Sequence, residues 1–329
     1  MVLSFNNEIP LNTWREFAFT NPHSNPFQTP EFYSTFNSVP GFSCEAVAIT
    51  QDEKILSLAI LTIQKESGIK GWFSRRGIIY GGPLIDINHP EAFDLLLTGI
   101  EKVFARLSIY TESRNLSDYK HFNIIFTGHN WKYIPYTNIT LKLEGTNLKN
   151  ILAGMKYNRR REISLSIDGG AVYRECQTYS ELKILYGLLS DLYLNRIKLP
   201  LPDYLFFEKM WQFYYGKIFI VIHNNKLIGG SFCFIQPAKA IYTMYYCGIR
   251  NYHKKIFPTH LAILAAIEYG INNGLQYLDF MGTGIRGEEY GVRRYKQEFG
   301  GESADFGRHR KINSRLLYHI GKAGLRLLR

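Results

Sequence analysis

The strongest constraint on the fold is an internal repeat, because residues 47–64 align without a gap on residues 219–236. Each stretch is an apolar run, a polar turn that ends in lysine, and a second apolar run that ends in glutamine. Two apolar runs around a short polar turn predict a β-hairpin. The repeat continues downstream at a similar spacing, where Pro90 aligns with Pro258. We therefore expect two copies of one α/β unit, with the function where the copies meet.

The order of elements predicts a mixed sheet in each copy rather than a doubly wound parallel sheet. In the first copy, paired strands and a strand at 77–80 precede a helix from Pro90 and a strand at 123–126. In the second, strands at 218–222, 227–235 and 240–246 precede a helix from Pro258 and a strand at 276–280. Between the copies, helices are expected over 147–166 and 182–194.

The predicted fold class is α/β of the α+β type, with two tandem domains that each contain a mixed, largely antiparallel sheet flanked by helices. The expected N-terminal domain covers residues 1–137, and the C-terminal domain, which carries the predicted active site, covers 138–307. Residues 308–329 have seven lysines and arginines and no acidic residue, and an apolar stripe runs through them. They predict a basic amphipathic helix, which suits either an anionic membrane surface or packing on the domain.

Composition limits the cellular setting and the partners. The chain has 329 residues, 46% of them hydrophobic, which suits two globular domains. Its four cysteines form no C-x-x-C pair, and no metal site is expected. With no signal-peptide pattern and no long apolar run, we expect a cytoplasmic protein. The net charge of +11 favours anionic partners, namely nucleic acid, phosphorylated metabolites or an anionic membrane face.

Several short motifs occur in an order that resembles a known family. They are the stretch 25–30 followed by Phe32, the helix start 159–163, the turn 195–200, and the segment 274–301 that contains Tyr-Lys-x-x-Phe-Gly at 295–300. In this order they resemble the Fem family of peptidoglycan bridge-forming aminoacyltransferases and related tandem GNAT-like acyltransferases. One departure is that Phe32 and Phe36 stand where the bridge-forming enzymes usually have tryptophan and lysine. This departure argues against a UDP-linked peptidoglycan precursor as acceptor.

The resemblance implies that Lys296 and Tyr295 are the catalytic residues. By resemblance, the lysine of this motif lies beside the acyl ester in the second domain. A cation there would stabilise the oxyanion that develops during acyl transfer. The alternative is an ordinary solvated surface lysine. No Ser/His/Asp or Cys/His pattern accompanies it, so direct attack without a covalent enzyme intermediate is expected.

The remaining candidates are charged residues that would hold the substrates. Arg159, Arg160 and Arg161 form a basic helix face that would bind substrate anions; the alternative is a face exposed only to solvent. Arg196 follows a helix and would bind either a phosphate or carboxylate of the substrate or backbone carbonyls of the chain. Segment 282–287 spells G-x-G-x-x-G without the βαβ unit of a dinucleotide site, so we expect a turn around the substrate with Arg286 as an anion contact. The other candidates are Asp279, as a contact or proton acceptor, and Lys254 and Lys255, as phosphate contacts.

The donor is inferred from a missing loop. In GNAT enzymes a glycine-rich turn before the central helix binds the coenzyme A pyrophosphate, but residues 252–258 contain no glycine. The expected donor is therefore aminoacyl-tRNA, with no tightly bound cofactor. The expected acceptor is an amino group of a cell-envelope precursor of peptidoglycan type, and a lipid-linked precursor would place the reaction at the membrane's inner face. The alternatives are an acyl-coenzyme A N-acyltransferase acting on an amino sugar of a surface polysaccharide, and a non-catalytic RNA-binding relative.

Overall fold

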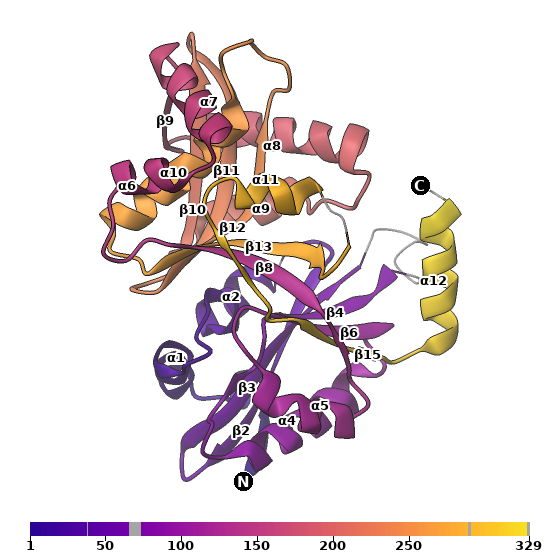
Figure 1. Cartoon of the computed structure of the whole chain (residues 1–329). Coiled ribbons are helices and arrows are strands. Elements are labelled where there is room, and N and C mark those ends of the chain that lie inside the picture. The colour runs from indigo at the N-terminus through magenta and orange to yellow at the C-terminus, as the bar shows by residue number, and fades with distance from the viewer. Residues whose placement is uncertain (38, 66–73, 289–290, 328–329) are drawn as a thin grey trace. The chain divides into compact units, whose positions relative to one another are not determined.

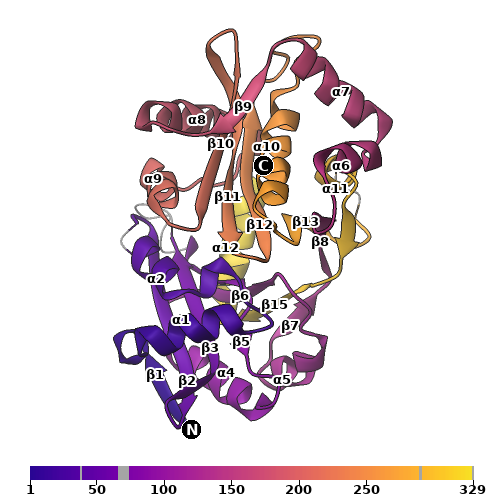
Figure 2. The same ribbon diagram turned by 90° about the vertical axis from the view of Figure 1, so that its left-hand side faces the viewer.

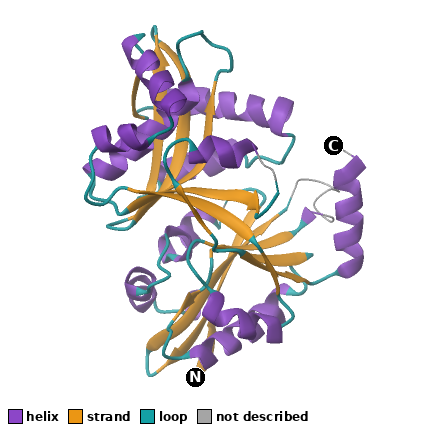
Figure 3. Ribbon diagram, viewed as in Figure 1, coloured by secondary structure: helices purple, strands orange, loops and turns teal. Residues whose placement is uncertain are grey.

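The computed structural model describes residues 1–37, 39–65, 74–288 and 291–327 (Figures 1 and 3). The chain divides into two compact units. The first consists of Met1–Tyr136 and Asp305–Arg329, and the second of Thr137–Ala304. Each unit contains one mixed, largely antiparallel sheet with helices on its faces, so the predicted fold class is confirmed.

The sheet of the first unit has the strand order β1-β2-β3-β4-β6-β15-β7, with β5 paired to β3. Strands β4 and β6 run parallel, and the other described pairs are antiparallel. The strands are β1 (Val2–Phe5), β2 (Phe42–Gln51), β3 (Lys54–Gln64), β4 (Arg76–Gly81), β5 (Leu84–Ile85), β6 (Tyr110–Asn115), β7 (Lys132–Ile134) and β15 (Arg308–Ile312).

Helices cover both faces of this sheet, since every residue of β3 after Lys54 is buried. Apolar side chains of α4 and α5 share one core with the sheet, while Trp14 of α1 and Phe32 of α2 are buried on the other side (Figure 1). The helices are α1 (Leu11–Thr20), α2 (Pro30–Phe36), α4 (Pro90–Phe104), α5 (Asn123–Gly128) and α12 (Arg315–Leu327), with 3-10 turns η1 (Asn6–Glu8), η2 (Pro26–Gln28) and η3 (Lys120–Phe122).

The sheet of the second unit has the corresponding order, β9-β10-β11-β12-β13-β8-β14. Strands β12 and β13 run parallel, in the place that β4 and β6 occupy in the first sheet. The strands are β8 (Tyr136–Lys142), β9 (Val172–Glu175), β10 (Gly216–His223), β11 (Lys226–Gln236), β12 (Ala240–Gly248), β13 (Tyr277–Ile285) and β14 (Glu302–Ala304).

Helix α10 is buried along most of its length and packs on this sheet together with α6 and α7. Helices α8 and α9 lie on the opposite face (Figure 2), where Phe207 contacts Phe232 of β11. The helices are α6 (Leu148–Gly154), α7 (Tyr157–Asp168), α8 (Tyr179–Leu192), the π-helix η4 (Tyr193–Ile197), α9 (Tyr204–Gln212), α10 (Pro258–Asn272) and α11 (Gly291–Gln297).

The two predicted hairpins are confirmed and correspond residue by residue. Hairpin β2–β3 turns at Asp52-Glu53 and hairpin β10–β11 at Asn224-Asn225, and all four residues have positive φ. Two consecutive left-handed residues form the turn whose twist matches that of paired strands. Each hairpin also has a register shift after the same aligned residue, Ile49 in the first and Val221 in the second. The repeat thus extends to irregularities of the backbone.

Four local predictions differ from the structure. Residues 123–126 belong to helix α5, and the strand expected there is β6, which ends before it. The single helix expected over 147–166 is two helices, because Met155 between them is extended. The segment 282–285 is not a turn but the end of β13. The expected helix over 308–329 begins as strand β15, and α12 starts only at Arg315.

Strand β15 shows why residues 308–312 are extended. It lies between β6 and β7, and it pairs antiparallel with both of them. In the second sheet, the same position between β13 and β14 is taken by β8. Each sheet is therefore completed by a strand from outside its own meander. The sequence prediction of a helix over the basic residues 308–312 did not include this pairing, which depends on distant strands.

Candidate active site

The parallel strands β12 and β13 of the second unit separate partway along their length. Their pairing ends with Tyr242 opposite Asp279. Beyond this point β12 continues to Gly248 beside β11, whereas β13 continues to Ile285 beside β8. At the fork, the hydroxyl of Thr243 donates a hydrogen bond to the carbonyl oxygen of Asp279 (3.3 Å). The divergence leaves backbone edges of both strands without a partner strand on that side.

Lys296 lies at this fork. It is only 5% exposed, and its Nζ donates hydrogen bonds to the carbonyl oxygens of Phe280 and Gly282 on β13. Burial lowers the pKa of Lys296 to about 8, and the charge of Asp279 opposes that change. An ammonium group has three donors, so two backbone acceptors leave one N–H for a further acceptor. Lys296 is therefore not the solvated surface lysine of the alternative interpretation.

Asp279 is fully buried and directly precedes Phe280, the first of these acceptors. Its carboxylate accepts hydrogen bonds from the amide of Asn138 (3.2 Å) and from the backbone N–H of Met281 (2.6 Å). Burial raises the pKa of Asp279 to about 6, while these two donors and Lys296 act in the opposite direction. Met281 has a φ of +60°, a left-handed conformation that is costly for a non-glycine residue. The backbone strain thus falls between the two carbonyls that bind Lys296.

Tyr295 links α11 to three other elements. Its ring stacks on that of Tyr246 of β12 at 6.1 Å, and its hydroxyl lies 3.1 Å from Nδ1 of His260 on α10. The guanidinium of Arg159 on α7 lies 4.3 Å from the centre of the same ring. Because Tyr295 contacts β12 and the adjacent Lys296 contacts β13, helix α11 spans the two diverging strands.

Arg159 is buried inside this cluster rather than presented to solvent. It donates to the carboxylate of Glu298 at 2.7 Å and contacts His260. Burial, together with the charge of Arg159, lowers the pKa of His260 to about 3, so the imidazole is neutral at physiological pH. Burial also raises the pKa of Tyr295 well above its usual value. The cluster therefore places a neutral phenol next to Lys296 in the chain and a neutral imidazole against that phenol.

The other predicted substrate-binding residues are not gathered at the fork. Arg160 is half-buried and donates to the carbonyl oxygen of Ala153. The remaining five are exposed on separate elements: Arg161 on α7, Arg196 on η4, Arg286 after β13, and Lys254 and Lys255 before α10. The structure thus unites Tyr295, Lys296 and Asp279 with Arg159.

A hollow of about 390 Å³ lies beside this cluster in the second unit. Three of its lining residues are at the start of α7 and three are on or just after α11: Lys156, Tyr157, Asn158, Arg294, Gln297 and Glu298. Glu298 connects the hollow to the cluster, because its carboxylate also binds Arg159. Its lining includes two cations, one anion and two side-chain amides, Arg294 pairs with Glu298 (3.6 Å), and more of the lining surface is apolar than polar.

The backbone at the start of α10 is already committed to contacts within the chain. The N–H of Ile256 donates to the carbonyl oxygen of His253 (3.3 Å), and the N–H of Phe257 donates to the hydroxyl of Ser166 (2.9 Å). Pro258, the first residue of the helix, has no N–H. An anion-binding helix start needs free N–H groups at these positions, and few remain.

The N-terminal motif used for the family resemblance has a structural role in the first unit. Gln28 is fully buried, accepts from the N–H of Ile60 on β3 (2.7 Å) and donates to the carbonyl oxygen of Tyr80 on β4 (2.8 Å). Asn25 lies so close to Gly81 that a β-carbon at that glycine would be 2.3 Å away. The motif thus fills the space beside the end of β4.

Sequence reasoning missed three residues of the cluster, namely His260, Asn138 and Glu298. Asn138 is in a predicted strand and His260 in a predicted helix, 122 positions apart, so spacing could not bring them together. Glu298 belongs to the segment 274–301 on which the family resemblance rests, but within that segment the resemblance pointed to Lys296 and not to Glu298. A charged residue two positions after the predicted catalytic Lys296 was the one available hint.

Known structures share the fold of this protein over nearly its whole length, but their sequences are only distantly similar to it. The sequence matches no family profile and no curated protein. Among solved structures, FemX has a TM-score of 0.72 at 14% identity and covers 97% of this chain and 99% of its own. The C-terminal domain of a putative lysylphosphatidylglycerol synthetase from Agrobacterium fabrum has a TM-score of 0.61 at 9% identity, covering 97% of this chain and 95% of its own.

A third similar structure is a tandem GNAT protein from the clavulanic acid biosynthesis pathway. It has a TM-score of 0.59 at 10% identity and covers 95% of this chain and 99% of its own. The resemblance predicted from the sequence motifs is thereby confirmed at the level of architecture over nearly the whole chain. The protein has the tandem GNAT-like fold that FemX also has.

Proposed function

We propose that this protein is a transferase that moves an aminoacyl or acyl group from an activated donor to an amino group. The observation that carries the proposal is Lys296, a buried lysine fixed by two backbone carbonyls at the point where β12 and β13 diverge. Its remaining N–H would donate to the donor's carbonyl oxygen as negative charge develops there. Such a preorganised donor stabilises the transition state because it needs no reorientation.

In this mechanism the other buried groups position Lys296 rather than react. The negative charge of Asp279 would stabilise the protonated form of Lys296. Asp279 would not itself accept the proton of the amine, because its oxygens are occupied by Asn138 and Met281. Tyr295 would keep α11 across the diverging strands through its contacts with Tyr246 and His260. The acceptor amine would attack the carbonyl carbon directly, and the bond from that carbon to the leaving group would break, with the proton that the amine loses passing to the leaving group. A tetrahedral oxyanion beside Lys296 would form between these two steps.

Aminoacyl-tRNA is the proposed donor. The occupied N–H groups at Ile256 and Phe257 leave little of the backbone cradle that a coenzyme A pyrophosphate needs. The hollow beside Arg159, which has Lys156 in its lining, is the proposed place for a phosphate of a nucleotide donor. The exposed cations Arg161 and Arg196, with Arg286, Lys254 and Lys255, are the proposed outer contacts for anionic parts of the substrates.

The proposed acceptor is a cell-envelope precursor of peptidoglycan type at an anionic membrane surface. On α12, Leu316 and Ile320 are 73% and 45% exposed and lie four residues apart on a helix rich in basic residues. An exposed apolar stripe with basic neighbours suits binding in the plane of a membrane interface. No helix among the described residues is long and apolar enough to span a membrane. Contact would therefore be peripheral, and the site of action would be the cytoplasmic face.

Thermal-shift titration separates the candidate donors, because a ligand that binds only the native state raises the melting temperature. The titrants are coenzyme A, acetyl-coenzyme A, and charged and deacylated bulk tRNA. A larger shift with charged than with deacylated tRNA supports the proposal. A shift with coenzyme A species alone would favour an acyl-coenzyme A N-acyltransferase. Equal, salt-sensitive shifts with both tRNA preparations would favour a non-catalytic RNA-binding protein.

A further inference from the structure

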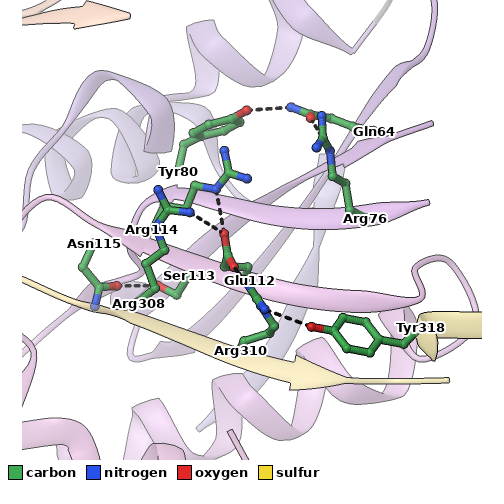
Figure 4. A network of polar contacts seen from close by, with 10 residues as sticks. All are labelled: Gln64, Arg76, Tyr80, Glu112, Ser113, Arg114, Asn115, Arg308, Arg310 and Tyr318. Carbon is green, nitrogen blue, oxygen red and sulfur yellow. Dashed lines mark hydrogen bonds and ion pairs between the residues drawn. The ribbon is translucent and has the colours of Figure 1, made fainter. Parts of the chain in front are cut away.

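A buried carboxylate in the first unit is surrounded by three arginines (Figure 4). Glu112 of β6 has a side chain that is 1% exposed. Its Oε1 accepts from Nε of Arg114 (2.9 Å) and from Nη1 of Arg308 (3.0 Å), and its Oε2 accepts from Nε of Arg310 (2.8 Å). We call these four residues the Glu112 arginine cluster.

The cluster has more positive than negative charge. Burial of Glu112 alone would raise its pKa, but the three guanidinium charges outweigh burial and lower that pKa to about 2. In the described part of the chain, no second carboxylate forms an ion pair with Arg114, Arg308 or Arg310. Three cations around one anion leave a net charge of about +2 at neutral pH.

The arrangement of the strands makes this excess costly. Arg114 and Arg308 are direct cross-strand partners on β6 and β15. Like charges at directly opposed positions destabilise a pair of strands. A single carboxylate oxygen shared between two guanidinium groups compensates only part of that repulsion. A second anion bound by both arginines would remove the rest.

Both arginines have donors available for such an anion. In the described part of the chain, no acceptor binds the two terminal nitrogens of Arg114 or the Nη2 of Arg308. Their side chains are 29% and 17% exposed, and none of these nitrogens is among the fully buried polar atoms that lack a partner. The guanidinium of Arg308 also lies 3.5 Å from the ring centre of Tyr136, which fixes its orientation. The donors are thus held in place before any ligand binds.

We propose that the Glu112 arginine cluster is a binding site for the phosphate or diphosphate group of a small ligand. The chemistry fits, because guanidinium groups bind phosphate oxygens through paired N–H donors. A dianion would match the uncompensated charge. The proposal does not depend on the transferase function, since all four residues belong to the first unit and Lys296 to the second.

The competing explanation is that the cluster only anchors β15 to β6. Two variants separate the two ideas. In Arg114→Gln, Glu112 keeps both arginines of β15, but the proposed site loses its most exposed donors. In Glu112→Gln, the carboxylate that competes with a bound phosphate is removed. Anchoring alone predicts that neither variant changes the response to phosphate.

The experiment is calorimetric and thermal-shift titration of the full chain with inorganic pyrophosphate and orthophosphate, at ionic strength matched with sodium chloride. Wild type should bind pyrophosphate saturably, and Arg114→Gln should bind at least about tenfold more weakly, since charge-assisted hydrogen bonds are lost. Glu112→Gln should melt lower without anion but gain a larger stabilisation from pyrophosphate than wild type. Arg15→Gln is the matched control, because Arg15 forms an exposed ion pair with Glu31 in the same unit.

Two results would overturn the proposal. One is a pyrophosphate response in Arg114→Gln, and in the charge-retaining Arg114→Lys, that equals wild type while circular dichroism shows both are folded. The other is absence of saturable binding at millimolar pyrophosphate. Co-sedimentation with phosphatidylglycerol vesicles distinguishes the ligand source. If Arg114→Gln abolishes vesicle binding as strongly as pyrophosphate binding, the anion is a lipid headgroup rather than a small soluble ligand.

Discussion

The two units have the same strand order but differ at their one described parallel strand pair. In the first unit, β4 and β6 pair through all six residues, from Arg76 opposite Tyr110 to Gly81 opposite Asn115. In the second, β12 and β13 pair over three residues and then diverge. This parallel pair is thus closed in the first copy and open in the second.

The neighbouring residues explain the difference. Beside β4, Gln28 bridges Ile60 and Tyr80, and Tyr119 donates to the carbonyl oxygen of Pro83 (2.6 Å). Tyr119 lies at the end of the β4–β6 pair, whereas Gln28 fills the space between β3 and β4, whose own pairing ends with Thr62 opposite Ile78. Beside β13, the corresponding groups are Lys296 and a strained Met281.

The comparison teaches that a repeated fold does not imply a repeated site. Closing the first copy requires buried side chains that satisfy the free backbone groups at the strand ends. In the second copy the open strand pair leaves room for the buried Lys296, which has one N–H group not used by the backbone. The chemistry is therefore expected in the second unit alone, and the four predictions that follow test this contrast.

The largest expected effect comes from removing the charge at the open fork. Lys296→Met keeps most of the packing volume but removes the donor, so kcat/KM for aminoacyl transfer should fall by about 10² or more. The melting temperature should fall, because Asp279 and two backbone carbonyl oxygens lose their partner, so kcat/KM is compared per folded molecule. Lys149→Met, an exposed lysine of α6, is the matched control. Activity within twofold of wild type in Lys296→Met would refute the catalytic role.

The next effect concerns the closed copy and is one of stability. Gln28→Ala should destabilise the protein by about 3 kcal/mol, because it leaves a buried N–H and a buried carbonyl without partners and opens a cavity. Denaturant unfolding measures this change. Gln51→Ala, at an exposed glutamine of the same unit, should stay within about 0.5 kcal/mol of wild type. Turnover per folded molecule should not change in either variant, and a large loss of turnover in Gln28→Ala would place chemistry in the first unit too.

The contrast between the copies shows what sequence alone could predict. The hairpins followed from two aligned apolar runs, and their positive-φ turn residues, Asp52-Glu53 and Asn224-Asn225, kept the alignment in register. The helices at Pro90 and Pro258 followed from proline in a first turn. These signals are local, and at these positions the tertiary contacts agree with them.

What could not be predicted depends on contacts that are distant in sequence. Strand β15 is basic, and only pairing with β6 and β7 makes it extended. Lys296 was found through its motif, yet its partners Phe280 and Gly282 are 14 or more residues away and bind through backbone atoms. Gln28 was noticed as part of a motif, but its role depends on two strands it does not adjoin in sequence.

A third prediction contrasts the buried carboxyls of the two units. The pKa of Asp279 is raised to about 6 by burial, so its ionisation costs stability, and that cost is fully present above pH 6. The pKa of Glu112 is lowered to about 2, so its ionisation adds stability that is present above pH 4.5 and lost as the pH falls towards 2. At pH 7, Asp279→Asn should therefore raise the melting temperature, and Glu112→Gln should lower it by an amount equivalent to about 2 kcal/mol. If both variants changed the melting temperature in the same direction, the two buried carboxyls would not differ in their effect on stability.

The smallest effect is a change in pH dependence at the open fork. Only protonated Lys296 can donate to a carbonyl oxygen, and burial holds its pKa at about 8. Relative to its value at neutral pH, the activity that depends on Lys296 should be about half at pH 8 and small above pH 9. Asp279→Asn removes the charge that raises the pKa of Lys296, so the alkaline limb should move to lower pH, whereas Lys149→Met should leave it in place. Because loss of a proton from the acceptor amine affects all three proteins equally, the displacement between them isolates Lys296. An alkaline limb that stays at the same pH in Asp279→Asn would mean that the two buried groups of the second unit do not act together.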